Sequence, residues 1–247
     1  MRRLVVEDVS KTFGVNGTAV RAVDRVTFAV DAGEFVSIIG HSGSGKTTLL
    51  SIVGGLCRPT SGRVLLDGTD LGGLDSDGLA AYRCEKVGFV FQFASLLPAL
   101  TALENLLLPL GFRPGRPRAE EGEAKARELL GLMGLSEKAH ALPSQLSGGQ
   151  QRRVAIARAF MNDPTLILAD EPTGDLDEET EAEVMAFFRA MNRRRGAAFV
   201  MVTHDLSLAA QAGRQLRMHR GRMVELASPA NAPQLAAAAE ARRGAST

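Results

Sequence analysis

The sequence predicts an α/β protein in which an antiparallel β segment comes first and a helical segment is inserted into a parallel sheet. A continuous apolar run at residues 35–39 is followed by a glycine-rich loop and a helical pattern. Residues 92–161 then lose strand character, and apolar runs return at 166–169 and 198–202 on either side of a long helical stretch. Fully apolar runs are typical of parallel strands covered on both faces, and their alternation with helices indicates one parallel sheet.

The N-terminal part is predicted to be antiparallel. Val26, Phe28 and Val30 alternate with smaller side chains, which is the pattern of a half-buried strand. The glycine-rich loop leads into a predicted helix over residues 46–56, and a second buried strand is predicted over 87–91.

The inserted segment is predicted to be helical because it carries helix signals at both ends. Thr101 and Glu104 form a capping box ahead of a leucine-rich stretch. Residues 111–117 hold two glycines and two prolines and predict a loop, whereas 118–133 have helix-forming composition that Gly134 ends.

The sheet resumes after the insertion, and a helix over 178–195, closed by Gly196, is predicted before the last apolar run. We expect one domain over residues 1–228. Its core comprises 1–92 with the antiparallel part and 162–228, its helical lobe comprises 93–161, and an Ala-rich tail to which we assign no function covers 229–247.

Composition excludes several classes of partner and location. The chain has 247 residues with 29 Lys and Arg against 28 Asp and Glu, so its net charge of +1 gives no field that favours nucleic acid. Cys57 and Cys84 fit neither a disulfide framework nor zinc spacing. No apolar run approaches the ~20 residues that a membrane span requires, and no signal-peptide core is present, so we expect any membrane crossing to belong to another subunit.

Residues 40–47, Gly-His-Ser-Gly-Ser-Gly-Lys-Thr, fit the phosphate-loop pattern GxxxxGK[ST] between a buried strand and a helix. The alternative is a simple glycine-rich turn. Glycines allow successive N–H groups to point at phosphate oxygens, and the helix N-terminus adds positive potential. We therefore expect a phosphate-loop NTPase (RecA-like) core that binds ATP and Mg²⁺. Its predicted nucleotide contacts here are Gly40, Ser42, Gly43, Ser44, Gly45, Lys46, Thr47 and Thr48.

Within this loop, Lys46 is expected to reach the β and γ phosphates, and the Thr47 hydroxyl is expected to bind Mg²⁺. Asp170 ends an apolar strand, where its carboxylate is expected to hold Mg²⁺ through the water shell. Glu171 follows where the chain leaves the sheet and is the predicted general base for an attacking water. The alternative is an ordinary solvated acidic pair before Pro172.

Residues 146–150, Leu-Ser-Gly-Gly-Gln, precede a helix rich in Ala and Arg. Free N–H groups and a serine hydroxyl at a helix start form a second anion-binding terminus, although five such residues could also be a plain loop. The predicted nucleotide contacts of this signature are Ser147, Gly148, Gly149 and Gln150.

Six elements occur in a fixed order: the phosphate loop, Gln92, the signature, the acidic pair, residues 174–177 and His204. In this order they resemble the nucleotide-binding domain of ATP-binding cassette proteins, and the resemblance covers about residues 4–225. It implies an ATPase that hydrolyses ATP to ADP and phosphate.

The resemblance also implies residue roles. Gln92 would contact Mg²⁺ and the attacking water, and Phe13 would stack on adenine where many relatives have Tyr. His204 would bond the γ-phosphate and orient Glu171, so the implied catalytic set is Glu171, His204, Gln92 and Lys46, with Thr47, Gln92 and Asp170 at the metal.

In such proteins the signature of one subunit faces the phosphate loop of another, which implies a head-to-tail dimer with two shared ATP sites. Asp175 and Asp177 would run across that interface, and we assign Asp175 no catalytic role.

Residues 91–98, 100–105 and 169–174 resemble the lipoprotein-releasing, macrolide-exporting and cell-division group of cassettes. This resemblance implies a cytoplasmic subunit, peripheral on the inner membrane, that energises a permease moving or extracting lipids, lipoproteins, peptides or macrolide-like compounds. A cell-division ATPase that signals through its permease without transport is the alternative within the group.

An apolar set beside Gln92 could receive the permease or pack inside the helical lobe; it comprises Phe93, Leu96, Leu97 and Leu100. Two further classes fit poorly. A DNA-repair or translation cassette would need coiled-coil arms or tandem cassettes, and a phosphate-loop kinase has no use for the signature.

Overall fold

A computed structural model describes residues 1–15, 18–113, 115, 117–174 and 176–225 of the chain. It contains a four-stranded antiparallel sheet of order β2-β1-β4-β5 and a six-stranded sheet of order β10-β9-β3-β8-β7-β6. Neighbouring strands from β9 to β6 are parallel, and β10 pairs antiparallel with β9.

The strands are β1 (Arg2–Val15), β2 (Thr18–Asp31), β3 (Phe35–Ile39), β4 (Ser61–Leu66), β5 (Thr69–Asp70), β6 (Val87–Val90), β7 (Leu166–Asp170), β8 (Ala198–Thr203), β9 (Arg214–His219) and β10 (Arg222–Glu225). The α-helices are α1 (Lys46–Val53), α2 (Ser76–Lys86), α3 (Ala102–Leu107), α4 (Ala119–Leu132), α5 (Gly148–Ala159), α6 (Glu178–Arg195) and α7 (Leu206–Ala209). Short 3₁₀ helices are η1 (Leu71–Gly73), η2 (Leu108–Phe112), η3 (Ser136–Lys138) and η4 (Pro143–Gln145).

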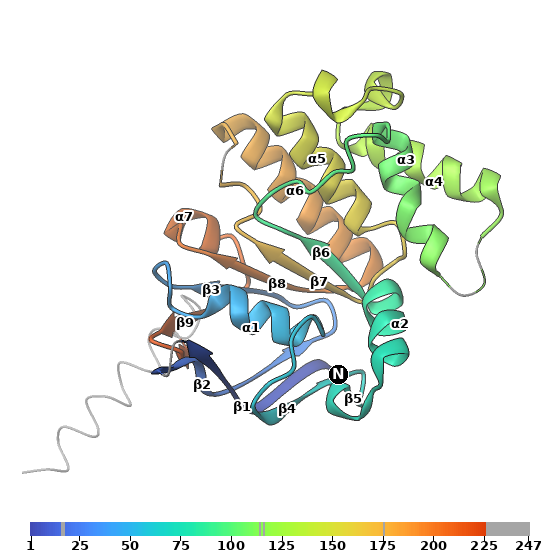
Figure 1. Cartoon of the computed structure of the whole chain (residues 1–247). Coiled ribbons are helices and arrows are strands. Elements are labelled where there is room, and N and C mark those ends of the chain that lie inside the picture. The colour runs from blue at the N-terminus through green and yellow to red at the C-terminus, as the bar shows by residue number, and fades with distance from the viewer. Residues whose placement is uncertain (16–17, 114, 116, 175, 226–247) are drawn as a thin grey trace, which may run out of the picture.

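The six-stranded sheet is covered on both faces, which explains its continuous apolar runs (Figure 1). Along β8 the side chains alternate between two hydrophobic cores. Phe199 and Met201 join the core of α3, α4, α5 and α6, whereas Val200 and Val202 join the core of α1 and the antiparallel sheet. Strand β8 therefore packs against the helical lobe on one face and against the rest of the molecule on the other.

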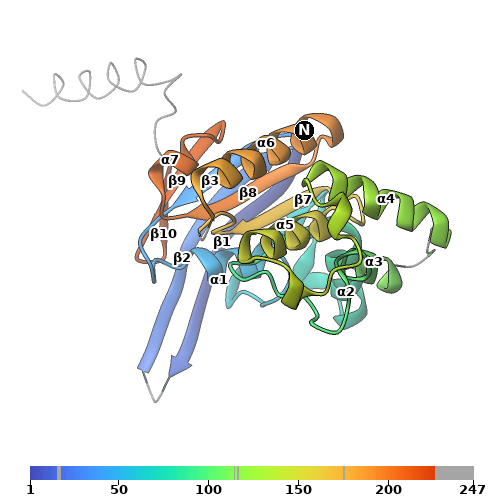
Figure 2. The same ribbon diagram turned by 90° about the horizontal axis from the view of Figure 1, so that it is seen from above.

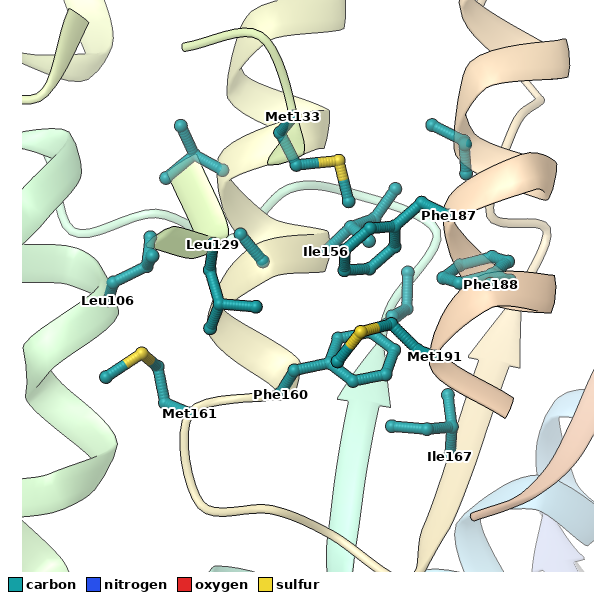
Figure 3. Packing of buried hydrophobic residues seen from close by; sticks show 14 of the residues in the cluster. Leu106, Leu129, Met133, Ile156, Phe160, Met161, Ile167, Phe187, Phe188 and Met191 are labelled. Carbon is teal, nitrogen blue, oxygen red and sulfur yellow. The ribbon is translucent and has the colours of Figure 1, made fainter. Parts of the chain in front are cut away.

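The helical side is held by interlocked aromatic and aliphatic side chains (Figure 3). Phe160 lies at the centre, edge-on to Phe187 with ring centroids 5.0 Å apart and 6.1 Å from Phe199. Because Phe160 directly follows α5, these contacts connect the end of the signature helix to both α6 and the sheet.

The two long strands β1 and β2 form a hairpin that extends from the body (Figure 2). Their pairing has register shifts between Val6 and Val9 and again up to Thr12. These irregularities break the alternation of apolar and polar residues, so only the regular end of β2 was predicted from the sequence.

Several predicted boundaries are confirmed. Thr101 and Glu104 form both hydrogen bonds of the capping box at α3. Gly196 closes α6 with a φ of 62°, a left-handed conformation that suits glycine. The predicted 118–133 helix is α4, and Gly134 follows it with a φ of 66°.

Other boundaries were wrong or incomplete. The helix predicted over 46–56 ends at Val53, since Gly54 is its C-cap and Gly55 has a φ of 68°. Part of the predicted loop 111–117 belongs to η2. Strands β1, β4, β5, β9 and β10 and helices α2 and α7 were not predicted, and the tail 229–247 lies outside the described residues.

Candidate active site

Parallel pairing brings four separate chain segments to one edge of the six-stranded sheet. The phosphate loop follows β3, Gln92 follows β6, Glu171 follows β7 and His204 follows β8. These carboxyl ends surround a hollow of about 610 Å³. Its lining comprises Ala22, His41, Ser42, Gly43, Ser44, Gly45, Lys46, Thr47, Thr48, Gln92, Asp170, Glu171, Gly174 and His204.

The phosphate loop needs its glycines for two physical reasons. Gly43 and Gly45 have φ angles of 74° and 104°, a region that side chains disfavour. A Cβ atom at Gly45 would also lie 2.1 Å from the carbonyl oxygen of Ala22, which cannot move aside easily. The loop thereby stays tight enough for its N–H groups to face the hollow.

Two polar side chains of the loop suit an anion in the hollow. Lys46 is buried, and its Nζ donates to the carbonyls of Gly40 at 2.6 Å and His41 at 3.2 Å. Within the described part of the chain, the buried Ser44 hydroxyl oxygen has no hydrogen-bond partner. A buried hydroxyl beside a lysine and open N–H groups matches the chemistry of a bound polyphosphate.

Asp170 is buried at the end of β7. Burial raises the pKa of its carboxyl, with a further rise from the negative charge of Glu171. A hydrogen bond with Thr47 and the positive charge of Lys46 oppose that rise. Thr47 and Asp170 thus lie together as predicted, and both offer oxygen atoms, the ligand type that Mg²⁺ prefers.

The carboxylate of Glu171 is held from two sides. The Thr203 hydroxyl donates to its Oε2 at 2.9 Å, and Nδ1 of His204 lies 3.0 Å from its Oε1. The Glu171 side chain is only 13% exposed, whereas that of His204 is 70% exposed. Glu171 is therefore held in place by β8, and His204 is open to a ligand.

The backbone of Glu171 is strained. Its φ of 44° lies in the left-handed region, which costs a non-glycine residue about 1–3 kcal/mol. Its N–H donates to Val202 at 3.0 Å, which ties the residue to β8. Such strain at a polar cleft indicates a residue whose position matters more than its local stability.

The signature forms a well-capped helix start. The Ser147 hydroxyl accepts from the N–H of Gln150 at 3.2 Å, and the Gln150 side chain accepts from the N–H of Ser147 at 3.0 Å. The signature residues are absent from the lining of the hollow. The fold of one chain thus keeps the predicted second anion terminus apart from its own phosphate loop.

Three other predicted residues have different outcomes. Phe13 lies on β1 and does not line the hollow. The Nζ atom of Lys11 lies over the Phe13 ring, 5.1 Å from its centroid. Asp177 caps α6 by accepting from the N–H of Thr180. Asp175 lies outside the described residues.

Sequence reasoning missed two residues of this site. Thr203 is fully buried at the end of β8, and an apolar strand ending in Thr immediately before His204 was the available signal. Arg152 on α5 is also buried and contacts the backbone around Glu171. Its signal was an arginine four residues before Ile156 on the buried face of a helix.

Comparisons with known proteins agree with this geometry. The family description "ABC transporter" matches residues 23–174. The macrolide export ATP-binding/permease protein MacB of Syntrophobacter fumaroxidans is 44% identical over 98% of this chain, which spans 34% of that relative. An "Uncharacterized ABC transporter ATP-binding protein" of Thermotoga maritima is 49% identical over 87% of this chain and 91% of the relative. This chain belongs to the ABC transporter family.

Solved structures support the same assignment for this ABC protein. The dimeric, post-hydrolysis cassette MJ0796 bound to ADP and Pi has a TM-score of 0.85 and 42% identity, covering 90% of this chain and 98% of that chain. A second dimeric structure of MJ0796, described as a bacterial ABC transporter cassette, gives the same values. The predicted fold, the resemblance to macrolide exporters and the expectation of an ATP-hydrolysing enzyme are confirmed.

We predict that Thr203→Val lowers kcat for ATP hydrolysis by on the order of tenfold, because the isosteric side chain cannot donate to the Glu171 carboxylate. Thr203→Ser keeps the hydroxyl and should stay near the wild-type rate. Steady-state phosphate release at saturating MgATP is the measurement. Equal rates in the two variants would contradict the orienting role.

Proposed function

We propose that this chain is the ATP-binding and ATP-hydrolysing subunit that energises a separate membrane permease. The permease would move or extract lipids, lipoproteins, peptides or macrolide-like compounds. The observation that supports this proposal most strongly is the position of the Glu171 carboxylate. Thr203 and His204 hold it at the open end of a hollow suited to phosphate. MacB, of which this chain matches only 34%, is named as both ATP-binding protein and permease, which supports the coupling to a permease.

The phosphate loop binds the ATP phosphates in this proposal. Its N–H groups and the helix start of α1 face the anion, and Lys46 exchanges its carbonyl contacts for phosphate oxygens. The Ser44 hydroxyl gains the partner that it lacks among the described residues. Phe13, half-exposed on β1, offers an aromatic face for adenine stacking.

The oxygen donors at the foot of the loop suit Mg²⁺. The side chains of Thr47 and Asp170 are hydrogen-bonded to each other, and Gln92 lines the same hollow. Bound there with ATP, Mg²⁺ would neutralise the β and γ phosphates. Burial raises the pKa of the Asp170 carboxyl, and the hydrogen bond with Thr47 and the positive charge of Lys46 oppose that rise, which favours the ionised form that a metal requires.

Hydrolysis follows from the position of Glu171. Its carboxylate accepts a proton from water at the γ-phosphate, while Thr203 keeps the acceptor oxygen aimed. His204 is exposed enough for its ring to approach the γ-phosphate while its Nδ1 lies 3.0 Å from Glu171 Oε1. Lys46 stabilises the charge that develops on the phosphate.

A complete ATP site requires two copies of the chain. The signature helix start lies outside the hollow of its own chain, although its N–H groups suit a phosphate. Two copies arranged head to tail place the signature of each against the phosphate loop of the other, with residues 93–161 as the lobe that carries the signature. The dimeric MJ0796 cassettes support this arrangement.

We predict that Glu171→Gln reduces turnover by on the order of 100-fold or more because the general base is removed. ATP then stays bound, so the variant should run as a dimer in size-exclusion chromatography with MgATP and as a monomer without nucleotide. A monomer under both conditions would contradict the shared site.

An apolar hollow of about 600 Å³ between α2, the end of β6 and η2 is the proposed permease-docking groove. Phe91 and Phe112 are its exposed aromatic rims, at 43% and 73% exposure. Exposed aromatic groups around a concave apolar surface suit an inserted apolar helix. None of the set predicted from the sequence lines this hollow. Leu96 packs against the core, whereas Phe93 and Leu97 are exposed at 73% and 44%, so their part in docking stays a prediction.

The proposed location is the cytoplasmic face of the inner membrane, through the permease. Among the described residues, no helix is both long and apolar enough to traverse a bilayer.

We predict that Phe112→Asp abolishes co-purification of the chain with its permease from detergent-solubilised membranes, because a charge is placed on the rim of the groove. Leu132→Asp is the matched control, since Leu132 is an exposed leucine of α4 outside the hollow. Melting temperatures check that both variants fold. Equal recovery of the permease with both variants would contradict this docking surface.

A further inference from the structure

Arg152 is a buried arginine of α5 that the roles described so far do not use. Its guanidinium donates to four backbone carbonyls in two separate segments. On one side it bonds Phe91 at 2.6 Å and also Gln92; on the other it bonds Pro172 at 2.7 Å and also Glu171. These segments follow β6 and β7, which are neighbours in the sheet.

The contacts fall on the backbone of two residues proposed to act at the γ-phosphate. Glu171 has a φ of 44°, so its backbone requires support from its surroundings. Val202 accepts from the Glu171 N–H at 3.0 Å, and Arg152 donates to the Glu171 carbonyl. The strained residue is therefore fixed at both of its polar backbone groups.

We propose that Arg152 is a positioning residue for ATP hydrolysis, which holds Gln92 and Glu171 in one fixed geometry. This inference rests on the proposed roles of those two residues. Arg152 is not a lining residue of the nucleotide hollow, so its hydrogen bonds act on the reaction through the two segments that it joins.

The geometry requires arginine rather than any cation. The guanidinium is planar, with donors fixed at different directions, and here Nε, Nη1 and Nη2 each reach a different set of carbonyls. A lysine ammonium presents its donors from a single point and cannot span both segments. Glutamine has one NH₂ group and would leave most of the four carbonyls without this donor.

Other arginines of α5 show that this arrangement is specific to one position. Arg158 donates to the carbonyls of Ala94 and Ser95, farther along the segment after β6. Arg153 donates to the carbonyl of Met133 and to Glu183 on α6. Arg153→Gln is therefore a matched control on the same helix.

The test compares Arg152→Gln, Arg152→Lys and Arg153→Gln in the full chain. Arg152→Gln should lower kcat by about 10- to 100-fold, the range expected when reacting groups are displaced by about 1 Å, and leave the KM for MgATP within about twofold. Because ATP binds but is hydrolysed more slowly, the variant with its native Glu171 should be found more often as an ATP-bound dimer than the wild type. Arg152→Lys should recover only part of kcat, and Arg153→Gln should turn over like the wild type.

Three results would overturn the proposal: a kcat within about twofold of wild type in Arg152→Gln, full recovery in Arg152→Lys, or loss of MgATP binding together with turnover. The last result would show a purely structural role. The Glu171→Gln variant separates this inference from the proposed function. If Glu171→Gln fails to dimerise with MgATP, the shared site is contradicted. If Glu171→Gln dimerises but Arg152→Gln turns over like the wild type, only the positioning role is contradicted.

Discussion

The parallel pairing of β3, β8, β7 and β6 is the constraint on which the site depends. Parallel strands end at the same edge, so residues far apart in sequence meet there without any long-range motif being required. Lys46, Gln92, Glu171 and His204 all line one hollow for this reason. Hydrophobic cores cover both faces of this sheet and bury the strands whose ends carry these residues.

Within that frame the structure orients the reacting groups through backbone contacts as much as through side chains. Thr203, at the end of β8, reaches the Glu171 carboxylate, and Arg152 reaches the Glu171 carbonyl from the helical side. Arg152 lies five positions after Ser147, in the helix that the signature begins. In the proposed dimer, α5 would in this way connect the signature of one ATP site to Gln92 and Glu171 of the other site.

The sequence predicted those parts whose physics is local. The phosphate loop, the capping box at Thr101 and the left-handed Gly196 are decided within a few residues, and each is present in the structure. The long strand β1 was missed because its register shifts break the periodicity by which strands are detected.

The parts that failed depend on partners distant in sequence. The helical spacing places Arg152 on the buried face of α5, but its partners are carbonyls about 20 and 60 residues away, which no local pattern identifies. Beside Gln92 the sequence left permease docking and internal packing open: Leu96 packs against the core, whereas Phe93 and Leu97 stay exposed. The exposed rings of the proposed groove, Phe91 just after β6 and Phe112 of η2, become neighbours only on folding.

If one ATP site is built from two chains, inactive variants of its two halves should complement each other. Lys46→Ala removes the phosphate-loop half, and Ser147→Arg removes the signature half. If the site is shared, a mixed dimer retains one intact site, so mixing the two purified variants should restore ATPase activity that neither has alone. If the mixture is as inactive as each variant alone, under conditions in which the wild type is active, a site shared between two chains is contradicted.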